Sequence, residues 1–129
     1  MDRSVLFVTP FSHDGKDLAG MLNDISILVV HAASLAEAAD QLNAQRFGVV
    51  LCEAQLVDGT WLNLLELTRA HGVELVVTDP FADARFWAMA INLGAYDMLA
   101  QPFHRTEVRR VLGGAAMRRS NKVATAAAY

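Results

Sequence analysis

The chain has 129 residues, of which 53% are hydrophobic and 19% are charged, and its formal net charge is −3. This length suits one domain with a real core, and this composition excludes a disordered chain. The mild charge argues against nucleic acid or an anionic membrane as the main partner. No apolar run approaches the roughly 20 residues of a membrane helix, and the first residues, MDRSVLFVTP, resemble no secretion signal. One cysteine fits a reducing compartment, so we expect a cytoplasmic domain.

Five short apolar runs divide the chain, and their lack of polar alternation is typical of strands covered on both faces. They lie at residues 5–8, 27–30, 49–52, 75–77 and 98–100. Segments with helical spacing of apolar residues follow each run, at about residues 14–22, 35–42, 61–68, 86–93 and 105–119. Ser34 is the expected N-cap of the second helix, and Gly94 ends the fourth. The alternation predicts an α/β fold, a doubly wound five-stranded parallel sheet with helices on both faces.

Polar residues stand where the predicted strands end, which is where such sheets concentrate their function. Thr9 and Pro10 follow the first strand, and Glu53 follows the third. Thr78 ends the fourth strand and Gln101 the fifth. Because parallel strands bring their carboxyl ends to one edge, we expect these residues to form one small polar pocket.

Three segments resemble the receiver domains of bacterial response regulators. GAYDMLAQPF, residues 94–103, resembles their fifth strand with its Lys-Pro-Phe ending, and LVVTD resembles their fourth strand. VVLCEAQLVDG resembles their third strand and the turn before the third helix. The resemblance covers residues 3 to about 119 and implies the flavodoxin-like strand order 2-1-3-4-5 and a cis Gln101–Pro102 bond. We assign residues 1–119 to this receiver-like domain and residues 120–129 to a tail or the start of a linker.

The resemblance also implies roles for the pocket residues, and most of these positions are altered. Receivers carry an acidic pair that holds magnesium where this chain has Thr9 and Pro10. Glu53 occupies the position of the aspartate that accepts the phosphoryl group, and Gln101 that of a lysine that pairs with it. Thr78 keeps the hydroxyl that bonds a phosphoryl oxygen.

These substitutions predict a domain that is not an enzyme, holds no metal or cofactor, and works without aspartyl phosphorylation. Mg²⁺ relies on carboxylates, which Thr9 and Pro10 lack, and Gln101 brings no positive charge. The longer side chain of Glu53 can place its carboxylate where a phosphoryl group would lie, and there it would accept hydrogen bonds from Thr78 and Gln101. The competing interpretation is that Glu53 is a solvated carboxylate at a strand end.

The resemblance further implies a contact surface made by the fourth helix, fifth strand and fifth helix. Its partner would be a histidine kinase, an output domain or another regulator, or a second copy of the chain in a homodimer. Met98 stands in place of the family's switch aromatic, so we expect a surface that does not toggle. The residues predicted for this surface are Arg85, Met89, Asn92, Tyr96, Arg105, Arg109 and Arg110.

Two other functions remain open. One is a receiver that still accepts phosphate by an unusual route. The other is a small flavodoxin-like binder of a cofactor or anion, with the anion at the loop of residues 9–17 before the first helix. An N-cap role for Ser12 or Asp14 explains the residues of that loop more simply than anion binding does. We also favour the N-cap role over a second alternative, in which Asp14 supplies a displaced carboxylate to a metal ion.

Overall fold

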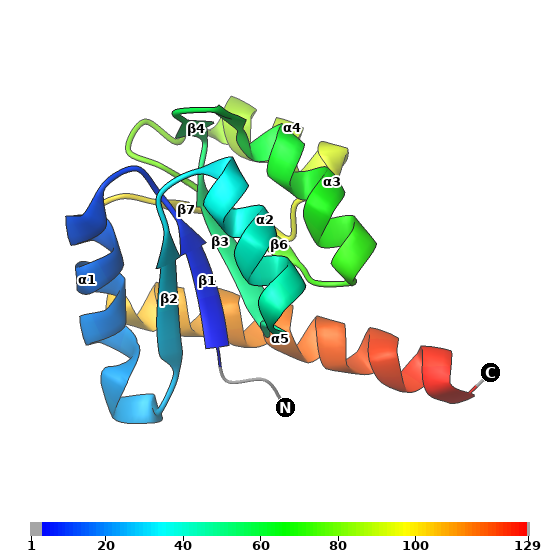
Figure 1. The fold of residues 1–129 in the computed structure, drawn as a ribbon. Helices are drawn as coiled ribbons and strands as arrows, with labels where there is room; N and C mark the ends of the chain where they lie inside the picture. Colours follow the sequence, from blue (N-terminus) through cyan, green and yellow to red (C-terminus); the bar gives the residue numbers. More distant parts are fainter. Residues whose placement is uncertain (1–3, 129) are drawn as a thin grey trace.

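The computed structural model describes the backbone of residues 4–128 and the side chains of residues 4–118. Five parallel strands form one sheet in the order β2-β1-β3-β6-β7 (Figure 1). In chain order they are β1 (Ser4–Val8), β2 (Leu28–Ala32), β3 (Val49–Glu53), β6 (Leu75–Asp79) and β7 (Asp97–Ala100). The predicted parallel sheet is confirmed, and so is the order 2-1-3-4-5, in which β6 and β7 are the fourth and fifth strands.

Helices cover both faces of this sheet (Figure 1). On one face α1 (Ser12–Leu22) and α5 (Arg105–Ala128) close a core that includes Phe7 and Leu51. On the other face α2 (Leu35–Ala44), α3 (Trp61–His71) and α4 (Ala84–Leu93) close a second core that includes Leu6 and Val50. A short 3₁₀ turn, Asn23–Ile25, follows α1. Successive strand residues alternate between the two cores, as a sheet buried on both faces requires.

A hairpin that the sequence patterns did not predict links β3 to α3. Its two short antiparallel strands are β4 (Gln55–Leu56) and β5 (Gly59–Thr60). Asp58 at its tip accepts hydrogen bonds from the backbone amides of Leu35, at 2.8 Å, and Ala36, at 3.1 Å. These amides lie in the first turn of α2, where backbone donors have no partner within the helix. The hairpin is therefore fastened to α2, and the two bonds hold the pKa of Asp58 below its ordinary value.

The helix ends agree with the predictions in part. Ser34 caps α2 as expected, because its side chain accepts a bond from the amide of Glu37 at 3.2 Å. The N-cap of α1 is instead Phe11, with no side-chain cap, so the expectation of Ser12 or Asp14 as N-cap is wrong. Gly94 ends α4 with φ +120°, a conformation that L side chains rarely adopt.

The last helix is longer than its apolar spacing predicts. We expected it to end near residue 119, but the backbone stays helical to Ala128 and projects beyond the sheet (Figure 1). Residues 120–128, predicted as a tail or the start of a linker, are thus helical, and residue 129 lies outside the described part. The Gln101–Pro102 bond is cis, as predicted.

Candidate functional site

The carboxyl edge of the sheet brings the predicted pocket residues to one face. Four strands each contribute a buried side chain to the core under α1 and α5. These side chains are Phe7, Leu51, Val76 and Leu99. Because strand side chains repeat their direction every second residue, the residues two positions later share that face. These are Thr9, Glu53, Thr78 and Gln101. The sheet register agrees, since Glu53 pairs with Thr78 across β3 and β6.

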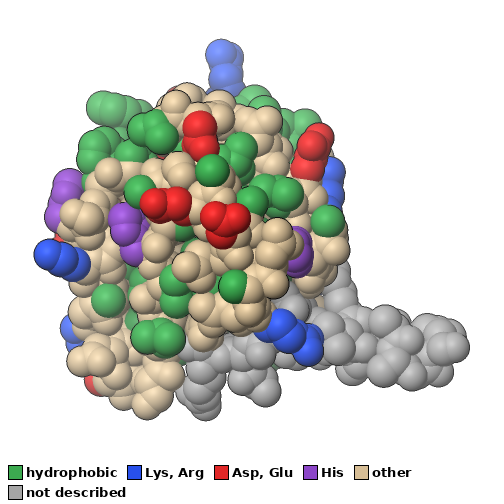
Figure 2. All heavy atoms as spheres, viewed as in Figure 1, with side chains coloured by type: hydrophobic (Ala, Val, Ile, Leu, Met, Phe, Trp, Pro, Cys, Tyr) green, Lys and Arg blue, Asp and Glu red, His purple; other side chains and the backbone are tan. Residues whose placement is uncertain are grey.

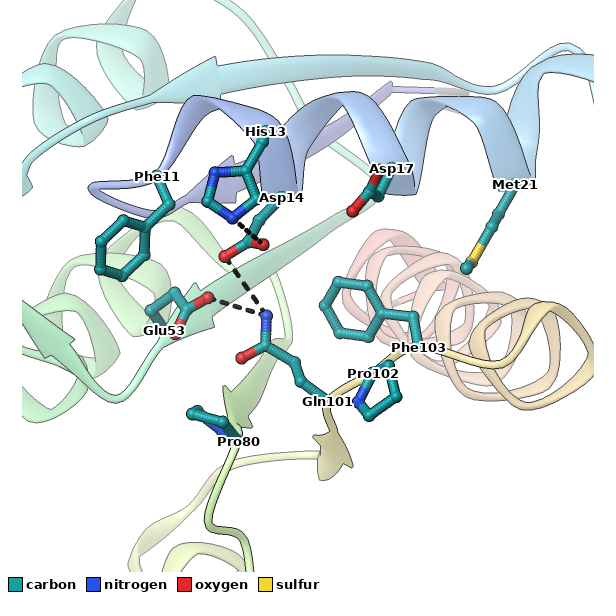
Figure 3. Close-up of a pocket in the computed structure, with 10 residues that line it drawn as sticks. All are labelled: Phe11, His13, Asp14, Asp17, Met21, Glu53, Pro80, Gln101, Pro102 and Phe103. Carbon is teal, nitrogen blue, oxygen red and sulfur yellow. Dashed lines mark hydrogen bonds and ion pairs between the residues drawn. The ribbon is translucent and has the colours of Figure 1, made fainter.

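Glu53 lies at the centre of this edge and is only 6% exposed. The amide Nε2 of Gln101 donates to Glu53 Oε1 at 3.0 Å, so the structure brings these two predicted residues together (Figure 3). The same amide reaches Asp14 Oδ2 at 3.4 Å. The interpretation of Glu53 as a solvated carboxylate is therefore wrong, because the side chain is buried and bonded.

Asp14 is the site residue whose role the sequence interpretation missed. It lies in the first turn of α1, and its carboxyl group points toward that of Glu53, with the amide of Gln101 reaching both (Figure 3). Its side chain is 17% exposed, and one of its oxygens lies 3.2 Å from His13 Nε2 (Figure 3). The available signal was its place in the first helical turn after β1, since that turn starts at the carboxyl edge of the sheet.

The surroundings of Glu53 change its acidity. Burial raises the pKa of its carboxyl group, and the hydrogen bond and negative charge of Asp14 raise it further. The amide of Gln101 and the hydroxyl of Thr9 act in the opposite direction, because they donate to the ionised form. Together these contacts raise the pKa of Glu53 to about 7.

Thr78 does not make the hydrogen bond to Glu53 that we expected. Its hydroxyl oxygen is fully buried and has no hydrogen-bond partner in the described part of the chain. The carboxyl group of Glu53 instead faces Asp14, Gln101 and Thr9. The expectation was wrong because strand register places two side chains on one face but does not fix the direction in which the longer one bends.

The open depression beside Glu53 is shown in Figure 3. Its polar lining comes from Glu53, Gln101 and the first half of α1, and its apolar lining comes mainly from the segment after β7 and from Met21. Thr9, Pro10 and Thr78 do not line it. Thr9 is fully buried, and its hydroxyl accepts a bond from the amide of Phe11 at 3.1 Å.

The site does not fit the magnesium that the receiver resemblance implies. Gln101 directs an N–H group at both carboxyl groups, where a cation would need an oxygen ligand. Within residues 4–118, no three His, Cys, Asp or Glu side chains gather so as to hold a metal ion.

The predicted contact surface is present in part. Arg85, Met89 and Asn92 are exposed on α4, and Arg105 and Arg110 are exposed on α5. The same helix α4 exposes further large apolar side chains, namely Trp87, Ile91 and Leu93. Met98, at the position of the family's switch aromatic, is buried in the core under α2, α3 and α4.

Two residues assigned to this surface make contacts within the domain. Arg109 donates to the backbone oxygen of Met21 at 3.1 Å and forms an ion pair with Asp24, so it joins α5 to the end of α1. Its assignment to the contact surface is therefore wrong. Tyr96 is half-buried, and the guanidinium of Arg118 lies 5.8 Å from its ring centre.

No part of the visible surface is strongly basic. Figure 2 shows acidic side chains in the upper middle of the face that carries α2 and α3, and Lys and Arg side chains at its margins. None of the helices in the described part of the chain is both long and apolar enough to span a membrane.

No family model matches the sequence, and no curated protein matches it either. Solved structures match its fold. The beryllofluoride-activated NtrC4 receiver domain dimer has a TM-score of 0.82 at 20% identity, with 91% of this chain and 98% of that chain covered. A CheY-like response regulator receiver domain protein from Methanospirillum hungatei JF-1 has a TM-score of 0.81 at 16% identity, with 95% and 99% covered. NtrX from Brucella abortus has a TM-score of 0.84 at 23% identity. That match covers 100% of this chain and 30% of the NtrX chain.

These identities are low, so the likeness is one of fold. The chain has the fold of response-regulator receiver domains, with their flavodoxin-like strand order. The predicted fold class is thereby confirmed.

Proposed function

We propose that this chain is a receiver-like signalling domain, not an enzyme, that acts in the cytoplasm by protein contact and does not accept a phosphoryl group at Glu53. The observation that carries this proposal is the arrangement of Glu53, Asp14 and Gln101. Two carboxyl groups and a neutral amide meet where a receiver would need a metal ion and a lysine.

Charge is the physical argument. Transfer of a phosphoryl group depends on positive groups that neutralise the charge that develops on its oxygens. Here a second carboxyl group, that of Asp14, lies beside Glu53, and Gln101 carries no charge. A pKa near 7 also leaves much of Glu53 protonated at neutral pH, and a protonated carboxyl group is a poor nucleophile.

One observation favours the alternative of a receiver that is still phosphorylated. Thr78 keeps a buried hydroxyl without a partner, which a phosphoryl oxygen would satisfy. Intact-mass measurement after incubation with acetyl phosphate and excess Mg²⁺ separates the two functions. We expect no gain of a phosphoryl group. A gain that disappears in Glu53→Gln would contradict the proposal, and a phosphorylatable receiver treated in parallel controls the reagent.

For the contact itself, we propose the exposed apolar side chains of α4. Side chains of Trp87, Met89 and Ile91 are between 36% and 50% exposed there, and Met, aromatic and Arg side chains are enriched at interfaces. Because Met98 replaces the switch aromatic, we propose that this surface is constitutive. The partner is a histidine kinase, an output domain, another regulator or a second copy of the chain.

Sedimentation of the purified chain tests the homodimer. We expect concentration-dependent association that Met89→Glu on α4 abolishes. Leu62→Glu is the matched control, because Leu62 is 45% exposed on α3, outside the proposed surface. A monomer at all concentrations would exclude the homodimer, and equal loss in both variants would exclude a specific role for α4.

A further inference from the structure

The carboxyl groups of Asp14 and Glu53 point toward one another, and the amide of Gln101 reaches both, at 3.4 Å and 3.0 Å (Figure 3). An ionised carboxylate only accepts hydrogen bonds, whereas a protonated one donates through its O–H. A hydrogen bond between two carboxyl groups placed in this way would therefore require one proton. Both groups are largely out of water, with Glu53 6% exposed and the Asp14 side chain 17% exposed. Two negative charges side by side with so little water around them would repel each other strongly.

Among the side chains of residues 4–118, none packed around the pair supplies a buried positive charge that would replace this proton. From α1, His13 touches Asp14 but is 74% exposed, and Asp17 adds another carboxylate to the depression. From β7 comes the neutral amide of Gln101, and from β1 the hydroxyl of Thr9. Burial and the charge of Glu53 raise the pKa of the neighbouring thiol, Cys52, which therefore stays neutral.

The remaining titratable neighbours face other groups. After β6, the carboxylate of Asp79 accepts a bond from the amide of Phe81 at 2.7 Å, within its own loop. From β2, a ring nitrogen of His31 lies 2.7 Å from the backbone oxygen of Thr9. Neither forms a bond with the carboxyl pair within the described residues.

We propose that the Glu53–Asp14 pair holds a single proton near neutral pH, and that its release to water as pH rises loosens the first turn of α1 from the end of β3. The proposal goes beyond the proposed function, because it concerns a signal that the domain receives and not the surface through which it acts. When the proton leaves the O–H between the two groups, two carboxylates remain, and the bond between them is lost.

The structure also identifies the element that responds. The first turn of α1 carries Asp14 and has no side-chain cap, since its N-cap is Phe11. Asp14 links this turn to the carboxyl edge of the sheet, because it lies beside Glu53 and the amide of Gln101 bonds both. Separation of the carboxylates would move this turn and widen the depression that Phe11, His13 and Asp14 line.

A pH titration followed by NMR tests this proposal. The probes are the side-chain carboxyl carbons of Glu53 and Asp14 and the backbone amides of the first turn of α1. In the unmodified chain we expect one titration step near neutral pH, shared by these probes. In Glu53→Gln and in Asp14→Asn we expect that step to disappear.

Two controls separate the pair from its neighbours. Asp17→Asn, in the same depression, should keep the step, and so should His13→Gln, which removes the imidazole that lies beside Asp14. Loss of the step in His13→Gln would overturn the proposal. An ordinary acidic titration of both carboxyl groups in the unmodified chain would overturn it too, whether or not any variant folds.

Added Mg²⁺ gives a third comparison. We expect the step to stay in place, whereas a large displacement to lower pH would show that the pair takes a metal ion in preference to a proton. The intact-mass experiment above does not depend on this titration, so either proposal can fail alone.

Discussion

Replacement of Glu53 by glutamine changes how the stability of the domain depends on pH. The carboxyl group of Glu53 ionises near 4.5 in an unfolded chain and near 7 in the folded one. Between these values the folded state binds more protons than the unfolded state, so stability falls as pH rises. The stabilisation that the folded state gains from the proton on Glu53 is complete below about pH 4.5 and lost above about pH 7.

The size of this effect on the free energy of unfolding follows from the difference in the pKa of Glu53 between the folded and unfolded states. At about 1.36 kcal/mol for each unit of pKa, the rise from 4.5 to about 7 corresponds to roughly 3 kcal/mol. Water at the open side of the depression screens the pair, so we expect about 1–2 kcal/mol. Glutamine has nearly the same shape, accepts from Gln101 and donates to Asp14, and carries no proton to release. Glu53→Gln should therefore match the unmodified chain near pH 4 and exceed its stability by that amount near pH 8.

Urea unfolding at a series of pH values measures this difference, with the fluorescence of the buried Trp61 as the signal. Glu66→Gln is the matched control, since Glu66 is exposed on α3 and its replacement should leave the pH profile parallel to that of the unmodified chain. If Glu53→Gln also gives a parallel profile, the pair does not share a proton and the reasoning is refuted.

Three further expectations concern the fold. Gly94→Ala should lower the free energy of unfolding by about 1–2 kcal/mol, because a φ of +120° suits glycine and not alanine. Gly20→Ala in α1 should raise the free energy of unfolding by about 0.5–1 kcal/mol, because the added methyl group meets open space. Urea unfolding compares the two variants. Leu51→Ala should cost about 3 kcal/mol, since Leu51 is fully buried, and a loss below 1 kcal/mol in the same assay would contradict its place in the core. Arg109→Ala should lower the melting temperature but leave self-association unchanged, and an opposite pattern in calorimetry and sedimentation would return Arg109 to the contact surface.

The sheet was predictable because strands that are buried on both faces have continuous apolar sequences. All five residues of β3 are buried, and they form an apolar run without alternation that ends at Glu53. The pattern overstated the burial of β2, where Leu28 is 62% exposed, because the residues alone do not distinguish an edge strand from a central one. The hairpin of residues 55–60 was missed since two-residue strands have no period to detect.

The sequence predicted where most of the site residues lie on the sheet edge, but it did not predict the directions in which their side chains point. Topology placed Glu53 and Gln101 at one edge, and the amide of one does bond the carboxyl group of the other. Asp14 was taken for a helix cap, because an acidic residue in a first turn fits a cap as well as a contact with the sheet edge. Arg109 was assigned to the wrong side of α5, since neighbouring positions on a helix differ by a third of a turn or less in the face they present.

The sparse attachment of α4 has a consequence for how the domain opens. Ala90 is the one residue of this helix that is buried below the surface, although the half-buried Phe86 also packs on the core. Segments with few buried contacts unfold locally at a lower free energy than the whole domain. Amide hydrogen exchange should therefore be faster in α4 than in β3, and a partner that binds α4 should slow it. Such a partner could order or reshape this helix while the sheet keeps its structure.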